Sequence, residues 1–217
     1  SAWSRTVSSS LPLRISAAIA PLIDPQSEET DPALAECAIF YSITNCQNGL
    51  RGISFGNLLI KQVVHELERE FPRLRTFATL SPVPGFRAWL TQVTRENAAV
   101  ADQLGGLEDS GWHEQALVAA RVQPLLMRLC AFYLTTAKRN GEPLDTVARF
   151  HLGNGARMEQ LNWFADTSKR GVERAAGMMV NYVYRLADVE RNHEAYVHEH
   201  EVVASHVLKK LARDCVL

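Results

Sequence analysis

The feature that most constrains the fold is a strand, a glycine-containing loop, a helix and a second strand, in that order, between residues 37 and 80. The short apolar and aromatic run 37–43 is typical of a buried strand. A turn-rich loop follows, and apolar residues at helical spacing then predict a helix over 57–71 that Pro72 closes. Residues 74–80 form a second strand candidate. A helix joining two such strands predicts a βαβ unit with parallel strands.

The rest of the chain is predicted to be mostly helical, with one late strand. The segment 81–85 carries Pro82 and Pro84 and is expected to end the second strand, because prolines cannot continue a central strand. Helices are predicted over 86–94 and 122–138, and an alternating strand over 177–186. Residues 202–212 form an amphipathic closing helix. Residues 1–36 are expected to be an irregular lead, the remnant of a longer N-terminal region, and 37–217 to be the catalytic domain.

Composition excludes several classes of protein. The 217 residues are 47% hydrophobic and 22% charged, with a net charge of -1, which is typical of a soluble globular protein rather than a nucleic-acid binder. No uninterrupted apolar stretch approaches the roughly 18 to 20 residues that span a bilayer, so no membrane is expected. The cysteines (Cys37, Cys46, Cys130 and Cys215) form no CxxC pair, which favours a reducing compartment. With no clear cleavage pattern near the N-terminus, the cytoplasm is the expected location.

The loop before the first predicted helix is a candidate phosphate site. A helix N-terminus has unpaired N–H groups and a positive partial charge, so it attracts phosphate. Gly52 and Gly56 carry no side chains, so a pyrophosphate could approach the backbone closely. A glycine-containing turn without any ligand is the alternative, since short glycine motifs are weak signals.

This loop resembles a motif of the acyl-CoA acetyltransferase superfamily. That motif is R-G-x-G-x-G-x-x-L-[LI] between a strand and a helix, and its loop amides hold the CoA pyrophosphate. Arg51, Gly52, Gly56, Leu59 and Ile60 match it, whereas Ser54 stands where the middle glycine usually is. That departure argues against an ordinary acetyltransferase role but keeps the cradle, because Ser54 still presents its backbone N–H. The residues expected to contact CoA are Arg51, Gly52, Ile53, Ser54, Phe55, Gly56 and Asn57.

Two further blocks resemble the malonyl-CoA decarboxylase family. They are FATLSPVPGF at 77–86 and RFHLGNGA at 149–156. Shorter stretches agree in the same order, at 40–43, 124–130, 162–166 and 180–184, so the resemblance runs from about residue 36 to 205. It implies an α/β (α+β) fold of the acetyltransferase-like (GNAT) type: a mixed sheet flanked by helices, with a helical insertion and with N-terminal strands missing.

The same resemblance implies a function and a site. The function is that of a carbon–carbon lyase in fatty-acid or malonate metabolism, which converts malonyl-CoA to acetyl-CoA and CO2. Ser81 and His151 would be the catalytic pair, and Tyr184 matches a tyrosine expected near them. The resemblance implies a homo-oligomer and, because malonyl-CoA is the substrate, no cofactor. The charge balance and the spacing of possible ligands lead us to expect no nucleic-acid partner and no metal.

The chemistry is compatible with these residue types. Loss of CO2 from a malonyl thioester leaves an enolate, which needs fixed donors and a proton delivered to carbon. Histidine suits the proton transfer because its unperturbed pKa of about 6.5 lies near working pH. The hypothesis is that His151 is the proton donor and Ser81 orients the carboxylate, although the sequence leaves open which residue does which.

Each of these residues also has a structural interpretation. Ser81 before Pro82 could cap a turn, His151 could be a core histidine, and Tyr184 could pack on its strand. Ser81, His151 and Asp166 could suggest a hydrolase triad, but Ser81 lies in no G-x-S-x-G elbow. His193, His198 and His200 lie among glutamates, and are interpreted as a solvated segment near a helix start rather than a metal site.

Two other functions stay open. One is an acyl-CoA acyltransferase that uses the same cradle, and the other is a truncated, non-catalytic CoA-binding domain. Family members usually carry an N-terminal helical domain and further early strands, so this chain is expected to be shortened. Missing strands would expose a sheet edge, and the activity is therefore expected to be weaker than in full-length relatives.

Overall fold

A mixed four-stranded sheet forms the centre of the molecule. The computed structural model describes residues 15–18, 24, 26, 31–41, 56–109 and 111–217, and for residues 56–61 it describes the backbone alone. The strands lie in the order β1-β2-β6-β5. Their bounds are β1 (Cys37–Tyr41), β2 (Thr76–Pro82), β5 (Arg157–Asn162) and β6 (Met179–Tyr184). β1 and β2 are parallel, whereas β2–β6 and β6–β5 are antiparallel, so the predicted βαβ unit with parallel strands is confirmed.

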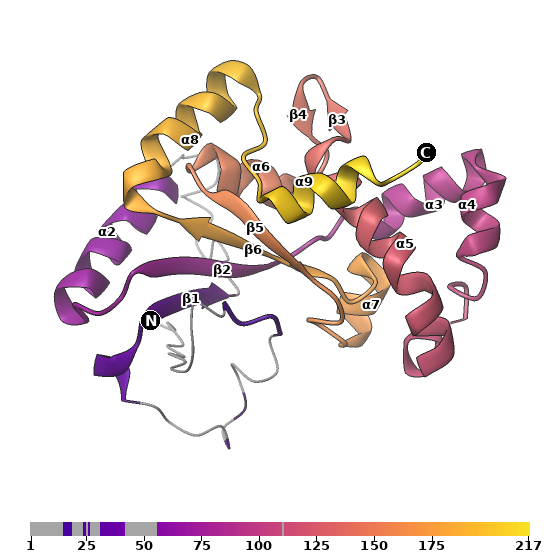
Figure 1. The fold of residues 1–217 in the computed structure, drawn as a ribbon, viewed down its shortest axis with the longest axis horizontal. Helices are drawn as coiled ribbons and strands as arrows, with labels where there is room; N and C mark the ends of the chain where they lie inside the picture. The colour runs from indigo at the N-terminus through magenta and orange to yellow at the C-terminus, as the bar shows by residue number, and fades with distance from the viewer. Residues whose placement is uncertain (1–14, 19–23, 25, 27–30, 42–55, 110) are drawn as a thin grey trace, which may run out of the picture.

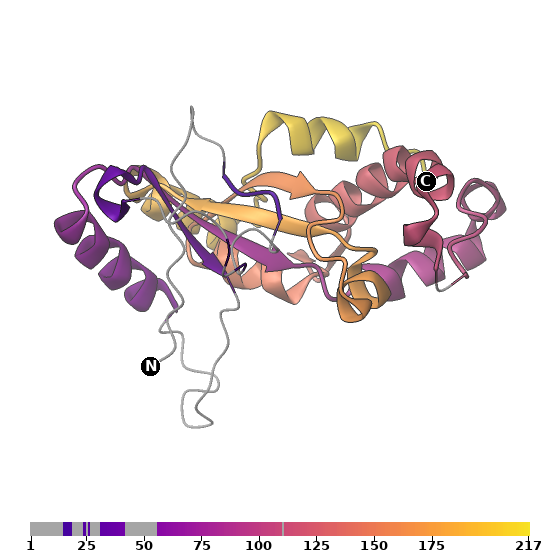
Figure 2. The ribbon, with the colours of Figure 1, turned by 90° about the horizontal axis from the view of Figure 1, so that it is seen from below.

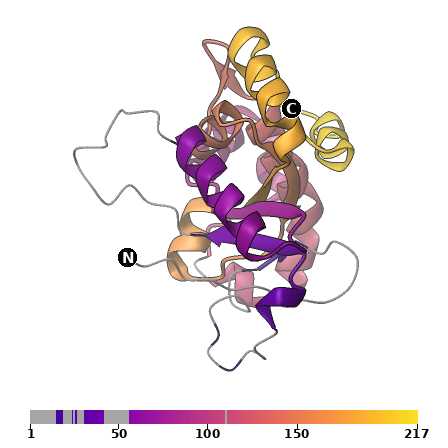
Figure 3. The same ribbon diagram turned by 90° about the vertical axis from the view of Figure 1, so that its left-hand side faces the viewer.

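Helices cover both faces of this sheet. Figure 2 shows α2 (Gly56–Glu70) and α6 (Thr146–Gly153) on one face and α9 (His206–Arg213) on the other. From the side of α2, that helix stands in front of the strands (Figure 3). Two further helices are α7 (Lys169–Ala175) and α8 (Leu186–Glu199), and a short η1 turn (Pro32–Leu34) precedes β1. The layered arrangement is the mixed, helix-flanked sheet that the sequence predicts.

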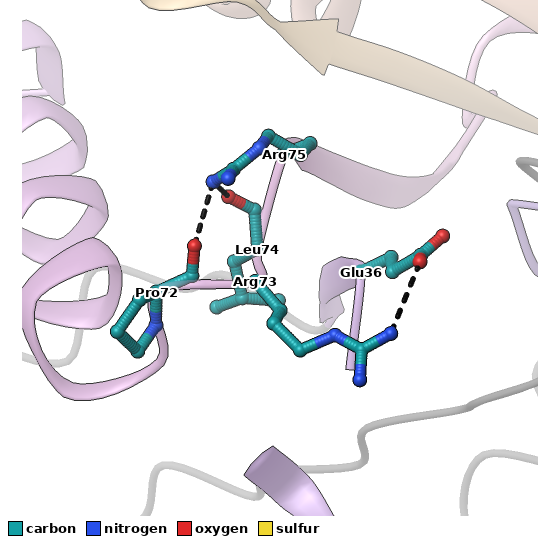
Figure 4. A network of polar contacts seen from close by, with 5 residues as sticks. All are labelled: Glu36, Pro72, Arg73, Leu74 and Arg75. Carbon is teal, nitrogen blue, oxygen red and sulfur yellow. Dashed lines mark hydrogen bonds and ion pairs between the residues drawn. The ribbon is translucent and has the colours of Figure 1, made fainter. Parts of the chain in front are cut away.

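The starts of β1 and β2 are joined by backbone hydrogen bonds. The carbonyl of Glu36 accepts from the N–H groups of Arg75 and Thr76, at 2.9 and 3.1 Å. Around it, Arg75 Nη1 donates to the carbonyls of Pro72 and Leu74, and Arg73 pairs with Glu36 at 3.7 Å (Figure 4). The Arg73–Glu36 pair is exposed and contributes little. The backbone bonds fix the register in which Leu80 of β2 lies opposite Tyr41 of β1.

A separate helical part packs beside the sheet (Figure 1). It contains α3 (Phe86–Glu96), α4 (Ala98–Gln103), η3 (Trp112–Glu114) and α5 (Ala116–Thr135), and a small hairpin of β3 (Lys138–Arg139) and β4 (Glu142–Pro143) follows. Within the described residues, α5 is the one helix that is long and apolar enough to cross a membrane. Half of that apolar stretch is buried, with Val122, Leu126 and Leu129 fully enclosed, and α5 packs against α9. Its composition is therefore accounted for by a core position.

Alternation along the central strands divides their side chains between two faces. Phe77, Thr79 and Ser81 of β2 share a face with Tyr182 and Tyr184 of β6. In the register of the two strands, Phe77 lies opposite Tyr184 and Thr79 opposite Tyr182. All five are buried. Leu80 and Met179 point to the other face and form a smaller apolar cluster with Ile39 and Ala165. The face that carries Thr79, Ser81, Tyr182 and Tyr184 is therefore the one on which the candidate site is built.

Several predicted boundaries shift, and one prediction about β2 is wrong. The strand does not end before Ser81 but continues through Pro82, which pairs with Met179 at the end of the ladder, where a missing N–H is tolerated. The predicted strand over 177–186 is β6, and the predicted closing helix begins later, at His206. Most of the predicted lead over 1–36 lies outside the described residues, so the division into lead and domain stays a prediction.

Candidate active site

His151 is placed by a helix that the periodicity analysis did not predict. α6 runs Thr146–Gly153, and its N-terminal residue is capped by Asp145, whose Oδ1 accepts from the Ala148 N–H at 2.8 Å. His151 lies in the last turn with its side chain 3% exposed. Its ring stacks on Tyr182, with ring centroids 4.2 Å apart and planes at 23°. The imidazole is therefore held between its own helix and the sheet.

Ser81 and His151, 70 positions apart in the sequence, meet in a hydrogen bond. Ser81 Oγ lies 3.0 Å from His151 Nε2, and both residues are buried. On the other side of the ring, His151 Nδ1 lies 2.8 Å from the hydroxyl of Tyr184. The structure thus brings together all three residues that the sequence proposes for catalysis. Whether they act in a reaction stays a prediction.

A third hydroxyl, that of Thr79, sets the direction of these hydrogen bonds. Ser81 donates to Thr79 Oγ1 at 3.0 Å. Ser81 Oγ then accepts from His151 Nε2–H, so Nδ1 carries no hydrogen and accepts from the Tyr184 hydroxyl. The result is one continuous chain from Tyr184 through His151 and Ser81 to Thr79. Thr79 is the member that sequence reasoning missed, although its place two residues before Ser81 on one strand was the available signal.

Burial keeps this chain electrically neutral. It lowers the pKa of His151 from 6.5 to about 3, because the enclosed ring loses the water that would stabilise its charged form. It also raises the pKa of Tyr184 well above its ordinary value of 10.0. At neutral pH the imidazole is therefore unprotonated and the phenol protonated, and a negatively charged ligand beside Nε2 would raise the pKa of His151.

The hydrolase triad is not formed. The position beside His151 Nδ1 that a triad carboxylate would occupy is taken by the Tyr184 hydroxyl. Asp166 lies elsewhere, in the loop before α7, where its Oδ1 accepts from the N–H of Ser168 at 3.0 Å. The geometry therefore supplies a serine–histidine pair backed by a tyrosine rather than a charge-relay triad.

The histidines near the C-terminus lie on and after α8. The interpretation that they lie near a helix start is wrong, because His193 lies in the middle of α8, His198 in its last turn and His200 just beyond its end. His193 Nδ1 bonds the carbonyl of Gly153 at 2.7 Å, whereas the ring of His200 packs on Gly141. Among the described residues, no three His, Cys, Asp or Glu side chains gather closely enough to hold a metal ion.

The predicted CoA cradle falls largely outside the described residues. Arg51, Gly52, Ile53, Ser54 and Phe55 are not among them, and Gly56 and Asn57 are described by their backbone alone. These two residues open α2, which confirms the expected helix start. Since Leu80 lies opposite Tyr41, Ser81 sits at the carboxyl edge of the parallel pair β1–β2, the edge from which the chain leaves β1 towards α2.

Comparison with known proteins points to one family. The sequence matches the family model of the malonyl-CoA decarboxylase C-terminal domain over residues 6–216. The chain is 39% identical over 211 residues to the mitochondrial malonyl-CoA decarboxylase of Rattus norvegicus and 38% identical over 217 residues to that of Anser anser anser. These alignments cover 86% and 88% of the chain but 43% of each relative, so the chain spans somewhat less than half the length of these proteins.

Solved structures agree with this result. The crystal structure of malonyl-CoA decarboxylase from Rhodopseudomonas palustris superimposes with a TM-score of 0.87 at 46% identity, over 95% of this chain and 48% of that one. The enzyme from Agrobacterium vitis gives 0.88 at 44% identity, over 96% and 52%. The fold of these enzymes is therefore shared across nearly all of the chain.

Proposed function

Because the chain belongs to the malonyl-CoA decarboxylase C-terminal domain family, we propose that it converts malonyl-CoA to acetyl-CoA and CO2 with Ser81 and His151. The observation that supports this most directly is the 3.0 Å contact between Ser81 Oγ and His151 Nε2, in a buried position backed by Tyr184. A buried pair of this kind offers a hydroxyl donor and a proton carrier within reach of one thioester.

In this proposal Ser81 holds the group that reacts. Its hydroxyl turns from Thr79 to donate to the malonyl carboxylate or to the thioester oxygen, where negative charge develops as the C–C bond breaks. A fixed hydrogen-bond donor in a site without water stabilises the developing negative charge more than water molecules do, because the donor does not have to reorient during the reaction. Thr79 holds the Ser81 hydroxyl in place until the substrate arrives.

His151 supplies the proton. The malonyl carboxylate beside Nε2 raises the pKa of His151, so the ring binds a proton from solvent together with the substrate. CO2 then leaves, the electron pair of the broken C–C bond stays on the α-carbon, and the Nε2 proton is transferred to it. Once the carboxylate is gone, burial again favours the neutral ring, which drives the transfer. Tyr184 serves both states, because its hydroxyl donates to bare Nδ1 and accepts from Nδ1–H.

The remainder of the substrate would be held by the loop before α2. Backbone N–H groups from Arg51 to Asn57 would receive the CoA pyrophosphate, and the start of α2 at Gly56 supplies the helix N-terminus that such a site uses. No cofactor is proposed. Cytoplasmic location, a homo-oligomeric state and a role in fatty-acid metabolism stay predictions of the sequence.

The test is product analysis with the purified 217-residue chain. Malonyl-CoA alone should yield equimolar CO2 and acetyl-CoA, and in D2O the acetyl group should carry one deuterium from the proton that His151 delivers. A requirement for an amine or alcohol acceptor, with malonyl transferred intact, would instead identify an acyltransferase. Binding of malonyl-CoA without any product would identify a non-catalytic domain.

A further inference from the structure

Two consecutive residues of α8, Asn192 and His193, bond the end of the helix that carries His151. His193 Nδ1 lies 2.7 Å from the carbonyl of Gly153, and Asn192 Nδ2 donates to the carbonyl of Gly155 at 3.2 Å. A carbonyl can only accept, so Nδ1 of His193 carries a hydrogen and donates it. Gly153 is the last residue of α6 and lies two positions after His151. The proposed reaction uses neither of the two α8 side chains.

The bond from His193 completes the hydrogen bonding at the end of α6. The last four carbonyls of a helix have no partner within the helix itself. In α6 the first three of them, those of residues 150–152, accept from backbone N–H groups of the turn that follows. The fourth, that of Gly153, accepts from His193. Because a half-buried carbonyl needs a partner, this bond ties the end of α6 to α8.

One face of α8 makes all the contacts with this end of α6. A Cβ at Gly155 would lie 2.1 Å from the backbone oxygen of Val189, and one at Gly153 would lie 3.7 Å from the ring of Tyr196. Val189 and Tyr196 are buried, and with Asn192 and His193 they follow the spacing of a single helix face. The two helices are therefore in close contact as well as hydrogen-bonded.

The segment that holds the end of α6 also holds the imidazole. β6 ends at Tyr184, whose hydroxyl lies 2.8 Å from His151 Nδ1, and α8 begins two residues later at Leu186. From there α8 runs beside α6 (Figure 1). One continuous stretch of chain thus bonds the ring at its start and the helix backbone further on. A shift of α6 along α8 would move the ring relative to both Tyr184 and Ser81.

We propose that Asn192 and His193 are positioning residues for the candidate site. Their bonds hold the end of α6 against α8, and so fix the imidazole of His151 between the hydroxyls of Ser81 and Tyr184. Neither side chain touches the reacting atoms in this proposal. The kinetic part of the test rests on the proposed decarboxylase function, whereas the spectroscopic part does not.

Two substitutions of His193 separate positioning from mere stabilisation of α8. His193→Leu removes the donor, whereas the side-chain amide of His193→Asn can still donate to the Gly153 carbonyl. If His193 only stabilised α8, Leu would be the better replacement, because its helix propensity is higher than that of Asn. If its bond to α6 positions the imidazole, Asn is the better replacement for catalysis. The two explanations predict opposite orders of kcat.

The expected kinetic changes are specific to kcat. In His193→Leu the kcat for malonyl-CoA should fall about tenfold, because a small misplacement of reacting groups is costly, while KM stays nearly constant. His193→Asn should stay within about threefold of the unsubstituted rate. The matched control is His198→Leu, which removes an exposed histidine from the last turn of α8 and should change neither constant. An unchanged kcat in His193→Leu, or an equal loss in His193→Asn or in the control, would contradict the proposal.

A second readout needs no activity. In the unsubstituted chain with 15N-labelled histidine, the ring signals should show a hydrogen on Nδ1 of His193 and on Nε2 of His151. In His193→Leu the His151 signals should average between the two tautomers, because the ring is no longer fixed between its two partners, and in His193→Asn they should not.

Two results would overturn the proposal on these signals alone. One is a bare Nδ1 on His193 in the unsubstituted chain, which decides the question even if His193→Leu fails to fold. The other is a set of His151 signals that is the same in His193→Leu as in the unsubstituted chain. If malonyl-CoA is not decarboxylated at all, the proposed function fails, while these signals still decide the role of His193.

Discussion

The hydroxyl of Tyr184 lies 2.8 Å from His151 Nδ1, on the side of the ring opposite Ser81. Because Ser81 donates to Thr79 and so accepts from the ring, Nε2 carries the hydrogen and the Tyr184 hydroxyl donates to Nδ1. A tyrosine rather than a carboxylate fills this position, so the buried site holds no permanent negative charge of its own there. The malonyl carboxylate can then be the one anion beside the imidazole.

Replacing Tyr184 by Phe should therefore weaken catalysis without unfolding the chain. Loss of one hydrogen bond of about 1 to 1.5 kcal/mol should lower kcat about tenfold, because Nδ1 loses its partner. The matched control is Tyr182→Phe, since the Tyr182 hydroxyl is buried and has no hydrogen-bond partner among the described residues, while its ring stacks on the same imidazole. Equal losses of kcat in the two variants would show that the Tyr184 hydroxyl has no particular role.

The buried neutral state of His151 should appear in the pH dependence of stability. Its pKa is lowered from 6.5 to about 3, so the unfolded chain binds a proton in this range that the folded chain does not. The contribution of the neutral ring to the free energy of unfolding is complete above pH 6.5. It is lost as the pH falls towards 3, by about 2 kcal/mol between pH 6.5 and pH 5.

Urea unfolding of the unsubstituted chain and of His151→Gln, at pH 7 and pH 5, measures this effect. The difference between their free energies of unfolding should shift by about 2 kcal/mol in favour of the Gln variant at pH 5. Asp145 contributes with the opposite sign, because its raised pKa of about 6 makes the folded state more stable as the pH falls through 6, but this contribution cancels in the difference. A difference that is independent of pH would mean that the ring is accessible to water.

The position of α6 should depend on Gly155. This residue has φ +77°, and a Cβ there would lie 2.1 Å from the backbone oxygen of Val189 in α8. Gly155→Ala should destabilise the chain by about 3 kcal/mol or more, from strain and from the forced movement of α8. Gly153→Ala is the control, because its Cβ would meet nothing closer than Tyr196 at 3.7 Å. Similar thermal midpoints for the two variants would argue against this packing.

Kinetic constants can distinguish the contribution of the proposed CoA loop to substrate binding from its contribution to the chemical step. Arg51→Ala should raise KM for malonyl-CoA about tenfold, the effect of one lost charged hydrogen bond, and leave kcat nearly unchanged. Arg73→Ala removes an exposed arginine whose ion pair with Glu36 spans 3.7 Å, and should change neither constant. An unchanged KM in Arg51→Ala would remove this residue from the proposed CoA site.

The sequence predicted the βαβ unit because its local signals agree: apolar strands, a glycine loop and a helix of clear period. It could not predict α6 from periodicity, because this helix has eight residues and mixed polarity, and His151 was found through a resemblance instead. The hydrogen bond from Ser81 to Thr79 and the contact of Ser81 with His151 depend on strand register and on how α6 packs against the sheet. Such long-range relations are set by packing and leave no local pattern in the sequence.

The proposed strand break at Ser81 shows the same limit. Pro82 predicts an interruption from local rules, yet the strand ladder holds it as its last position, opposite Met179. Ser81 is therefore a strand residue with a fixed direction rather than a turn cap. That direction, towards the face where α6 lies, is what brings its hydroxyl to His151.

The most direct measurement is a double-mutant cycle of kcat with malonyl-CoA, using Ser81→Ala, His151→Ala and the variant that carries both changes. If the two residues act as one unit, each single change should lower kcat about 100- to 1,000-fold, and the double change should lower it hardly further. Independent, multiplying effects would contradict the account, as would either single variant that keeps the full rate.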